Sequence, residues 1–229
     1  MRRVQVFDVN ETLLDLAAMG PHFQRIFGDA GVRVSWFNQM IQSALVATVT
    51  GVYRQFGTIG MAALEMTAER AGVELGDGDR EAVAAQMRRL PAHPEVAGAL
   101  RRLRDAGLRL AALTNSTEQV ARAQLEHAGL IGSFDLVLSA DAVQRLKPAP
   151  EPYRMAAERL GVAVGEVRLV AAHAWDVAGA LGAGCAAAFV ARPGKVLDPL
   201  AGRPEIVGAD LGEVGAAILA VDQDAHERP

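Results

Sequence analysis

The sequence predicts an α/β protein with a parallel sheet and a helical insert after the first strand. Five short apolar runs have strand character, and they cover residues 4–8, 108–114, 136–139, 167–171 and 186–190. Segments with helical spacing lie between them, at residues 94–106, 117–128, 150–160 and 175–182. Strands that alternate with helices favour a parallel sheet built with right-handed crossovers.

The interval from about residue 16 to residue 91 breaks this alternation. It contains three segments of helical spacing and no convincing strand; the segments are residues 36–49, 59–71 and 79–90. We therefore expect a core domain of residues 1–15 and 92–229 and a helical cap domain of residues 16–91. Sites in open parallel sheets gather at the carboxyl ends of the strands, so we expect the cap to cover those ends.

Composition excludes several classes of protein. With 229 residues, of which 51% are hydrophobic, the chain can bury a substantial core. The net charge of −4 offers no basic stripe and argues against nucleic acid as the main partner. The single Cys185 excludes an intramolecular disulfide and a zinc cluster built on cysteines. No signal peptide and no apolar run of roughly 18 residues is present, so we expect a cytoplasmic protein without a membrane segment.

Polar clusters follow four of the predicted strands. They are Asp8, the run Thr114-Asn115-Ser116, Lys147, and His173 with Asp176. Each alone is a weak signal, because polar residues at strand ends are common and several of them could simply cap the next helix. All four in this order are much more specific.

This order of motifs resembles the haloacid dehalogenase-like hydrolase superfamily, and within it the L-2-haloacid dehalogenases (type II). The matching stretches begin at residues 7, 110, 145 and 170 and read FDVNETLLD, LAALTNSTEQ, RLKPAPEPY and VAAHAWDVAGA. The resemblance spans residues 3 to about 215. It implies a Rossmann-like core with a helical cap, and displacement of halide from a 2-halo carboxylic acid through an aspartyl ester, without a metal or other cofactor.

Asn10 stands two residues after Asp8, where the superfamily's phosphatases carry a second Asp. That Asp protonates a leaving alkoxide, whereas halide leaves as a stable anion and needs no proton. An amide cannot act as a general acid. In the fourth motif of the phosphatases, Gly-Asp-x-x-x-Asp, the position of the first Asp is Ala172, and the second is Asp176. Magnesium prefers a cage of oxygen ligands, so metal-dependent phosphoryl transfer is disfavoured.

The resemblance implies catalytic roles for Asp8, Lys147 and Asp176. Asp8 is the expected nucleophile, and the positive charge of Lys147 would keep its carboxylate ionised and oriented. Asp176 would pair with Lys147 or support its loop. A solvated surface side chain is the commoner fate of a lysine, and a strand-end Asp can simply cap a turn. Neither alternative explains why these groups and Asn115 follow strands at one edge of the sheet.

The expected substrate-binding residues are Asn10, Thr12, Phe37, Thr114, Asn115, Tyr153 and Trp175. Thr12, Thr114 and Asn115 would donate hydrogen bonds to Asp8 or to the substrate carboxylate. Phe37 and Trp175 could wall an apolar slot for the carbon that bears the halogen, although packing of the cap on the core explains these aromatics almost as well. Tyr153 matches a tyrosine of the family's substrate site.

The chain departs from the dehalogenase pattern at several site positions. Asn10 and Glu11 replace Tyr and Gly in the first motif, Asp-x-Tyr-Gly-Thr. His173 replaces Asn in the fourth motif, Ser-Asn-Ala-Trp-Asp. Phe37 follows Trp36 where the family has a cap arginine that binds substrate and halide. This last change removes the family's usual anchor for halide and substrate.

Two of these departures are predicted to be coupled. Glu11 follows the first strand and His173 follows the fourth, which neighbours the first in this fold. A carboxylate beside an imidazole orients it and raises its basicity, which suits a base that activates water. The alternative is that a Glu at a helix start and a loop His make unrelated hydrogen bonds.

The leading hypothesis is therefore a 2-haloacid dehalogenase-like hydrolase whose partner is a small halogenated carboxylic acid. A small-molecule phosphatase with an altered metal site and a non-catalytic binding protein are the alternatives. The sequence leaves a homodimer open.

Overall fold

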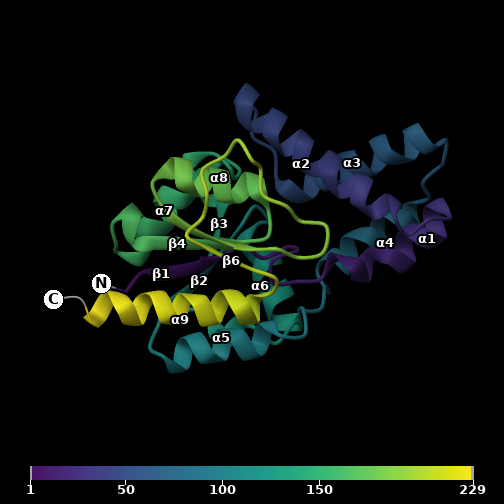
Figure 1. The fold of residues 1–229 in the computed structure, drawn as a ribbon. Helices are drawn as coiled ribbons and strands as arrows, with labels where there is room; N and C mark the ends of the chain where they lie inside the picture. The colour runs from purple at the N-terminus through teal and green to yellow at the C-terminus, as the bar shows by residue number, and fades with distance from the viewer. Residues whose placement is uncertain (1, 228–229) are drawn as a thin grey trace.

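The computed structural model describes residues 2–227, and a six-stranded sheet forms its centre (Figure 1). The strands are β1 (Val4–Phe7), β2 (Leu110–Thr114), β3 (Leu136–Ser139), β4 (Val167–Ala171), β5 (Ala186–Val190) and β6 (Ile206–Gly208). All neighbouring pairs are parallel, in the order β3-β2-β1-β4-β5-β6. This confirms the predicted α/β class, and the order is that of a Rossmann fold. Because β1 lies between β2 and β4, the loops after these three strands meet.

Helices cover both faces of the sheet. Successive side chains of a strand point to opposite faces, so Phe7 and Val6 belong to different hydrophobic clusters. The cluster of Phe7 is completed by α5 (Val96–Asp105), α6 (Glu118–His127) and α9 (Leu211–Glu227). The cluster of Val6 is completed by α7 (Pro150–Leu160) and α8 (Ala174–Ala183), on the other side of the sheet in Figure 1. A sheet covered on both faces favours strands that are mostly apolar, and the polar exceptions here, such as Gln5 of β1 and Arg168 of β4, are buried.

Four helices follow β1 and lie together beside the sheet (Figure 1). They are α1 (Gly20–Phe27), α2 (Val32–Thr50), α3 (Phe56–Ala71) and α4 (Asp77–Met87). Trp36 of α2 donates a hydrogen bond from Nε1 to the Gly60 carbonyl of α3, at 2.9 Å. A Cβ on Gly60 would lie only 3.0 Å from the Met40 methyl carbon, so the glycine permits this close approach. Treating residues 16–91 as a separate domain stays a prediction.

The sequence-based prediction missed α1, β6 and α9. Helix α1 has only eight residues, although Pro21 in its first turn and Gly28 just after it, with φ 74°, are ordinary boundary signals. Strand β6 has three residues, too few for a pattern to be recognised. Short 3-10 helices also occur, at Leu16–Met19, Ile131–Ser133, Ala140–Val143 and Val164–Glu166.

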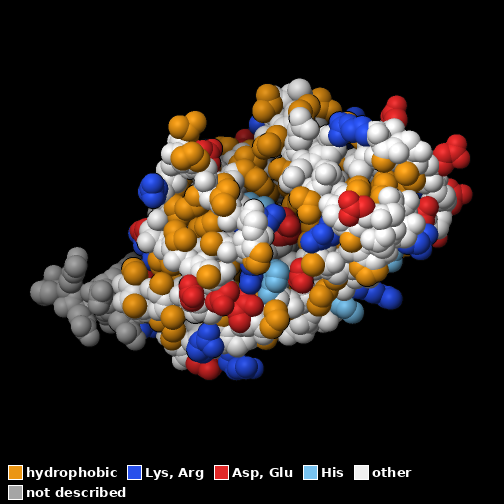
Figure 2. Space-filling view, turned by 45° about the vertical axis from the view of Figure 1, so that its right-hand side comes forward, with side chains coloured by type: hydrophobic (Ala, Val, Ile, Leu, Met, Phe, Trp, Pro, Cys, Tyr) orange, Lys and Arg blue, Asp and Glu red, His pale blue; other side chains and the backbone are white. Residues whose placement is uncertain are grey.

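Acidic and basic side chains are interspersed on the face shown in Figure 2, between scattered hydrophobic ones. Within residues 2–227, no helix combines the length and the apolar character that a membrane crossing requires.

Candidate active site

Lys147 lies between two buried carboxylates at the carboxyl edge of the sheet. Its Nζ donates to Asp8 Oδ1 at 2.9 Å, to Asp176 Oδ2 at 2.6 Å and to the Leu113 carbonyl at 3.0 Å, which uses all three of its N–H bonds. Burial lowers the pKa of Lys147, but the two carboxylates raise it by more, so the ammonium is retained. Burial raises the pKa of Asp8, but Lys147 and then His173 outweigh it, and the net pKa lies well below the usual range.

Thr12 orients the second oxygen of Asp8. Its hydroxyl donates to Asp8 Oδ2 at 2.6 Å and accepts from the backbone N–H of Ala172 at 2.9 Å. Because the Thr12 oxygen accepts a hydrogen bond from Ala172, just after β4, its hydroxyl hydrogen is free to point at the Asp8 carboxylate. The Thr12 carbonyl in turn accepts a 2.8 Å bond from Arg192, which also pairs with Glu95 at 2.6 Å. Arg192 thus ties the loop after β1 to the loop after β5.

Glu11 and His173 are in contact, as the coupled departures predicted. Glu11 Oε2 lies 2.8 Å from His173 Nε2 and also accepts a 2.6 Å hydrogen bond from Lys195 Nζ. The backbone of Glu11 is left-handed, with φ 62°, a conformation uncommon for a residue other than glycine. The imidazole is stacked between Phe37 of α2, with centroids 5.9 Å apart, and Trp175 of α8, at 5.1 Å. These contacts fix the plane of the ring.

The charge of His173 is governed by the carboxylates on both sides of it. Its Nδ1 lies 3.4 Å from Asp8 Oδ2, close enough for an ion pair, but the atom makes no hydrogen bond with any described residue. Burial lowers the pKa of His173, but Asp8 and Glu11 raise it by more, so the net pKa is above the ordinary value. Burial raises the pKa of Glu11, and His173 and Lys195 lower it to a net value below the ordinary one.

Three residues expected at the substrate make hydrogen bonds within the protein. Asn115 accepts from the Lys147 backbone N–H at 2.8 Å and donates to the Lys147 carbonyl at 3.2 Å, so it holds the lysine's backbone rather than Asp8. Thr114 Oγ1 accepts from the Ser116 N–H at 3.2 Å. The Tyr153 hydroxyl donates to the Asp176 carboxylate, and the place of Tyr153 in the substrate site stays a prediction. The reason is common to all three: each buried polar group satisfies its nearest unpaired neighbour.

Asn10 is held at the edge of the site. Its Oδ1 accepts a 3.0 Å hydrogen bond from Gln124 of α6, and its Nδ2 lies 3.5 Å from Ser116 Oγ. Gln124 was not anticipated, because a glutamine in a helix carries no sequence signal that points to a site. Lys195 and Arg192 were also missed, although two basic residues just after the fifth predicted strand are a signal that could have found them.

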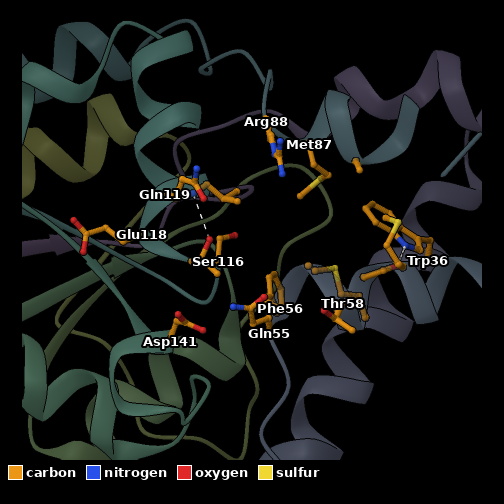
Figure 3. Close-up of a pocket in the computed structure, with 17 residues that line it drawn as sticks. Trp36, Gln55, Phe56, Thr58, Met87, Arg88, Ser116, Glu118, Gln119 and Asp141 are labelled. Carbon is orange, nitrogen blue, oxygen red and sulfur yellow. Dashed lines mark hydrogen bonds between the residues drawn. The ribbon is translucent and has the colours of Figure 1, made fainter. Parts of the chain in front are cut away.

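A small pocket opens on Asp8, with a volume of about 10 Å³, room for about one water molecule. It is lined by Asp8, Asn10, Phe37, Ile41, Phe56, Thr114, Asn115, Lys147, His173 and Trp175. A larger cavity, with a volume of about 670 Å³, lies elsewhere, between helices α2, α3 and α4 and the start of α6 (Figure 3). Asp8 does not line it, and we place the chemistry in the small pocket because the ionised groups converge there. Phe56 lines both spaces.

Known proteins resemble the chain over most of its length. The family model of haloacid dehalogenase-like hydrolases matches residues 3–184. The (S)-2-haloacid dehalogenase of Pseudomonas sp. (strain YL) is 30% identical over 201 residues, which are 87% of each chain. That of Xanthobacter autotrophicus is 31% identical over 194 residues, covering 84% of this chain and 76% of the relative. A solved structure of the L-2-haloacid dehalogenase from Xanthobacter autotrophicus, with chloropropionic acid covalently bound, has a TM-score of 0.89. It is 27% identical and covers 96% of this chain and 99% of its own.

Proposed function

Because the chain belongs to the haloacid dehalogenase-like hydrolase family, we propose that it displaces halide from a 2-halo carboxylic acid through an aspartyl ester on Asp8. The observation that carries this proposal is the buried Asp8 carboxylate, held by Lys147 at one oxygen and by Thr12 at the other. A carboxylate with a lowered pKa is anionic at neutral pH, as a nucleophile must be. The relatives named as (S)-2-haloacid dehalogenases support this choice of reaction.

In this proposal Asp176 and Tyr153 position Lys147 and do not react with the substrate themselves. Asp176 fixes Lys147 from the side opposite to Asp8, and the Tyr153 hydroxyl fixes Asp176. A rigidly held ammonium presents the attacking carboxylate in one orientation, which is a large part of what an enzyme contributes to a displacement.

Water must then hydrolyse the ester, and His173 is the proposed base. Its ring lies beside Asp8 and is oriented by Glu11. A neutral imidazole can take a proton from water, and the Glu11 carboxylate stabilises the imidazolium that results. Lys195 holds Glu11 in place from the other side.

Halide release from a panel of short 2-haloacids, measured with a chelator present, tests the proposal. We expect release to persist, because Asn10 and Ala172 stand where the phosphatases carry carboxylates. The Lys147 ammonium also lies between Asp8 and Asp176, so it takes the position of a cation there. Loss of activity on chelation with recovery on adding magnesium, together with hydrolysis of p-nitrophenyl phosphate, would favour the phosphatase instead. Inactivity on both substrate classes would favour a binding protein.

The substrate of this chain is proposed to be bulkier or more apolar than the shortest haloacids. Phe37 places an aromatic ring where the family has an arginine, and the ring lines the small pocket. Behind Phe56 the larger cavity offers space lined in part by Trp36, Met40 and Met61.

Substituting Phe37→Arg should shift selectivity toward the shortest acids. A guanidinium would supply a charge-assisted hydrogen bond to a small carboxylate, so the ratio of kcat/KM for chloroacetate to kcat/KM for 2-chlorohexanoate should rise about tenfold. Phe37→Leu is the matched control, since it removes the ring without adding a charge, and it should leave chloroacetate no better bound. An unchanged ratio in Phe37→Arg would mean that another group supplies the anchor.

A further inference from the structure

A 2-halo acid needs a positive partner for its carboxylate, and the cap offers none at position 37. The inference that follows rests on the proposed function, since it concerns how the same pocket binds the carboxylate of the substrate. Phe37 faces the pocket with an apolar ring. A buried carboxylate without a compensating donor is strongly disfavoured, so a group of the core must take over this contact.

Lys147 and Asn115, which line the small pocket, already make hydrogen bonds within the protein. The three N–H bonds of Lys147 are taken by Asp8, Asp176 and a carbonyl. Asn115 donates one amide hydrogen to the Lys147 carbonyl and accepts from the Lys147 backbone N–H. His173 Nδ1 is different: it is buried, lines the pocket through its ring, and makes no hydrogen bond with any described residue.

The contacts of the ring indicate that this nitrogen carries a hydrogen. Glu11 is an ionised acceptor, so Nε2 must be the donor in the 2.8 Å contact between them. Nδ1 is then either a lone pair or a second N–H. It lies 3.4 Å from the ionised Asp8 Oδ2, where a lone pair would be repelled and an N–H attracted.

We propose that His173 is an imidazolium while Asp8 is ionised, that its Nδ1–H binds the substrate's carboxylate, and that it gives up this proton once Asp8 is esterified. In a backside displacement the halogen departs on the side opposite to the attacking oxygen. The proposal takes Asp8 Oδ2 as the attacking oxygen. A donor 3.4 Å from this atom lies beside the reacting carbon, to which the carboxylate group is attached. The cation that the family places on the cap is thus supplied here by the core.

The protons balance over the cycle. Asp8 attacks C2, the carbon–halogen bond breaks and halide leaves, which converts Asp8 into a neutral ester. Nδ1 then loses its proton to solvent, so halide and one proton are released together. In the second half, neutral Nδ1 takes a proton from water as the oxygen adds to the Asp8 carboxyl carbon, and returns it to the departing alkoxide. The Asp8 acid that remains transfers its proton to Nδ1, which restores the starting pair.

The charges around the ring favour this switching. Asp8 and Glu11 face its two nitrogens, and Phe37 and Trp175 cover its faces without charge. Lys147 and Lys195 each lie behind one of the carboxylates. Esterification removes only the charge of Asp8, so one of two attractive charges is lost while both lysines remain, and the imidazolium is destabilised.

Nitrogen NMR of the ¹⁵N-histidine-labelled protein tests the proposal without turnover. We expect both ring nitrogens of His173 to be protonated at about pH 7.5, where an ordinary histidine is mostly neutral. Asp8→Asn mimics the neutral ester, and it should lower the titration midpoint of His173 by about one pH unit or more. His173→Gln assigns the signals, and the signals of His127, on α6, should be the same in the wild type and in Asp8→Asn. A neutral ring in the wild type, or an unchanged midpoint in Asp8→Asn, would overturn the proposal.

A second arm identifies the anion. Sodium propionate, a carboxylate without halogen, should shift the Nδ1 signal of the wild type, and sodium bromide at equal ionic strength should not. A shift with bromide alone would reassign Nδ1 to the departing halide, and a shift with neither would remove it from substrate binding. These outcomes do not depend on catalysis. A failed halide-release panel would therefore reject the reaction, whereas a failed titration would reject only the role of His173.

Discussion

Asp8→Asn is expected to abolish halide release, lowering kcat by about 10⁴-fold or more. A neutral amide is a far poorer nucleophile than a carboxylate, and the amide nitrogen cannot accept the hydrogen bond that Lys147 or Thr12 now donates. The protein should stay folded, because Lys147 keeps Asp176 as its buried counter-charge. The measurement is halide release over hours, with circular dichroism to verify the fold.

Two controls make this result decisive. Asp105→Asn makes the same chemical change at the exposed end of α5 and should retain wild-type activity. Mass spectrometry of the peptide that contains residue 8 reports any deamidation back to Asp. Substantial halide release by a preparation free of deamidated protein would remove Asp8 from the nucleophile's role.

His173→Ala is expected to separate the two halves of the reaction. At high substrate concentration the variant should release about one halide per active site and then stall, because nothing activates water against the ester. Intact-protein mass spectrometry should show the adduct, and digestion should place it on the peptide holding Asp8. The substrate concentration that gives half the maximal burst rate should rise about tenfold or more, since the Nδ1–H contact is lost.

Glu11→Gln is the graded companion of this variant. The imidazole remains but is oriented by a neutral acceptor, so ester hydrolysis should slow less than in His173→Ala. Steady turnover of His173→Ala at the wild-type rate would show that His173 does not activate water. Absence of any burst, even at saturating substrate, would instead mean that His173 is needed before the ester forms.

Much of the fold was readable from local patterns. The five strands and the helices between them were predicted close to their observed bounds, because continuous apolar runs and helical spacing reflect burial on a doubly covered sheet. The prediction missed β6 and α1, because three and eight residues are too few to show such a pattern. The order of Asp8, Lys147, His173 and Asp176 along the chain was enough to indicate one site, since parallel strands bring their carboxyl ends to a common edge.

The sequence also predicted that Glu11 and His173 are in contact, but it did not determine the protonation state of His173. The charge of His173 depends on Asp8 at 3.4 Å on one side and Glu11 at 2.8 Å on the other. Lys195 enters the same group from a loop 184 residues away from Glu11 in the chain. Coulomb energies change steeply over such distances, so only the folded geometry decides which nitrogen carries a proton.

The directions of the remaining polar groups were likewise decided by tertiary structure. Sequence reasoning placed Asn115 and Tyr153 among the substrate-binding residues, and only the fold shows that they make hydrogen bonds with the Lys147 backbone and with Asp176. Residue type and spacing determined which chemical groups reach the edge of the sheet. The pairing among those groups was settled by burial, because each buried donor or acceptor must find a partner at the distance that packing leaves available.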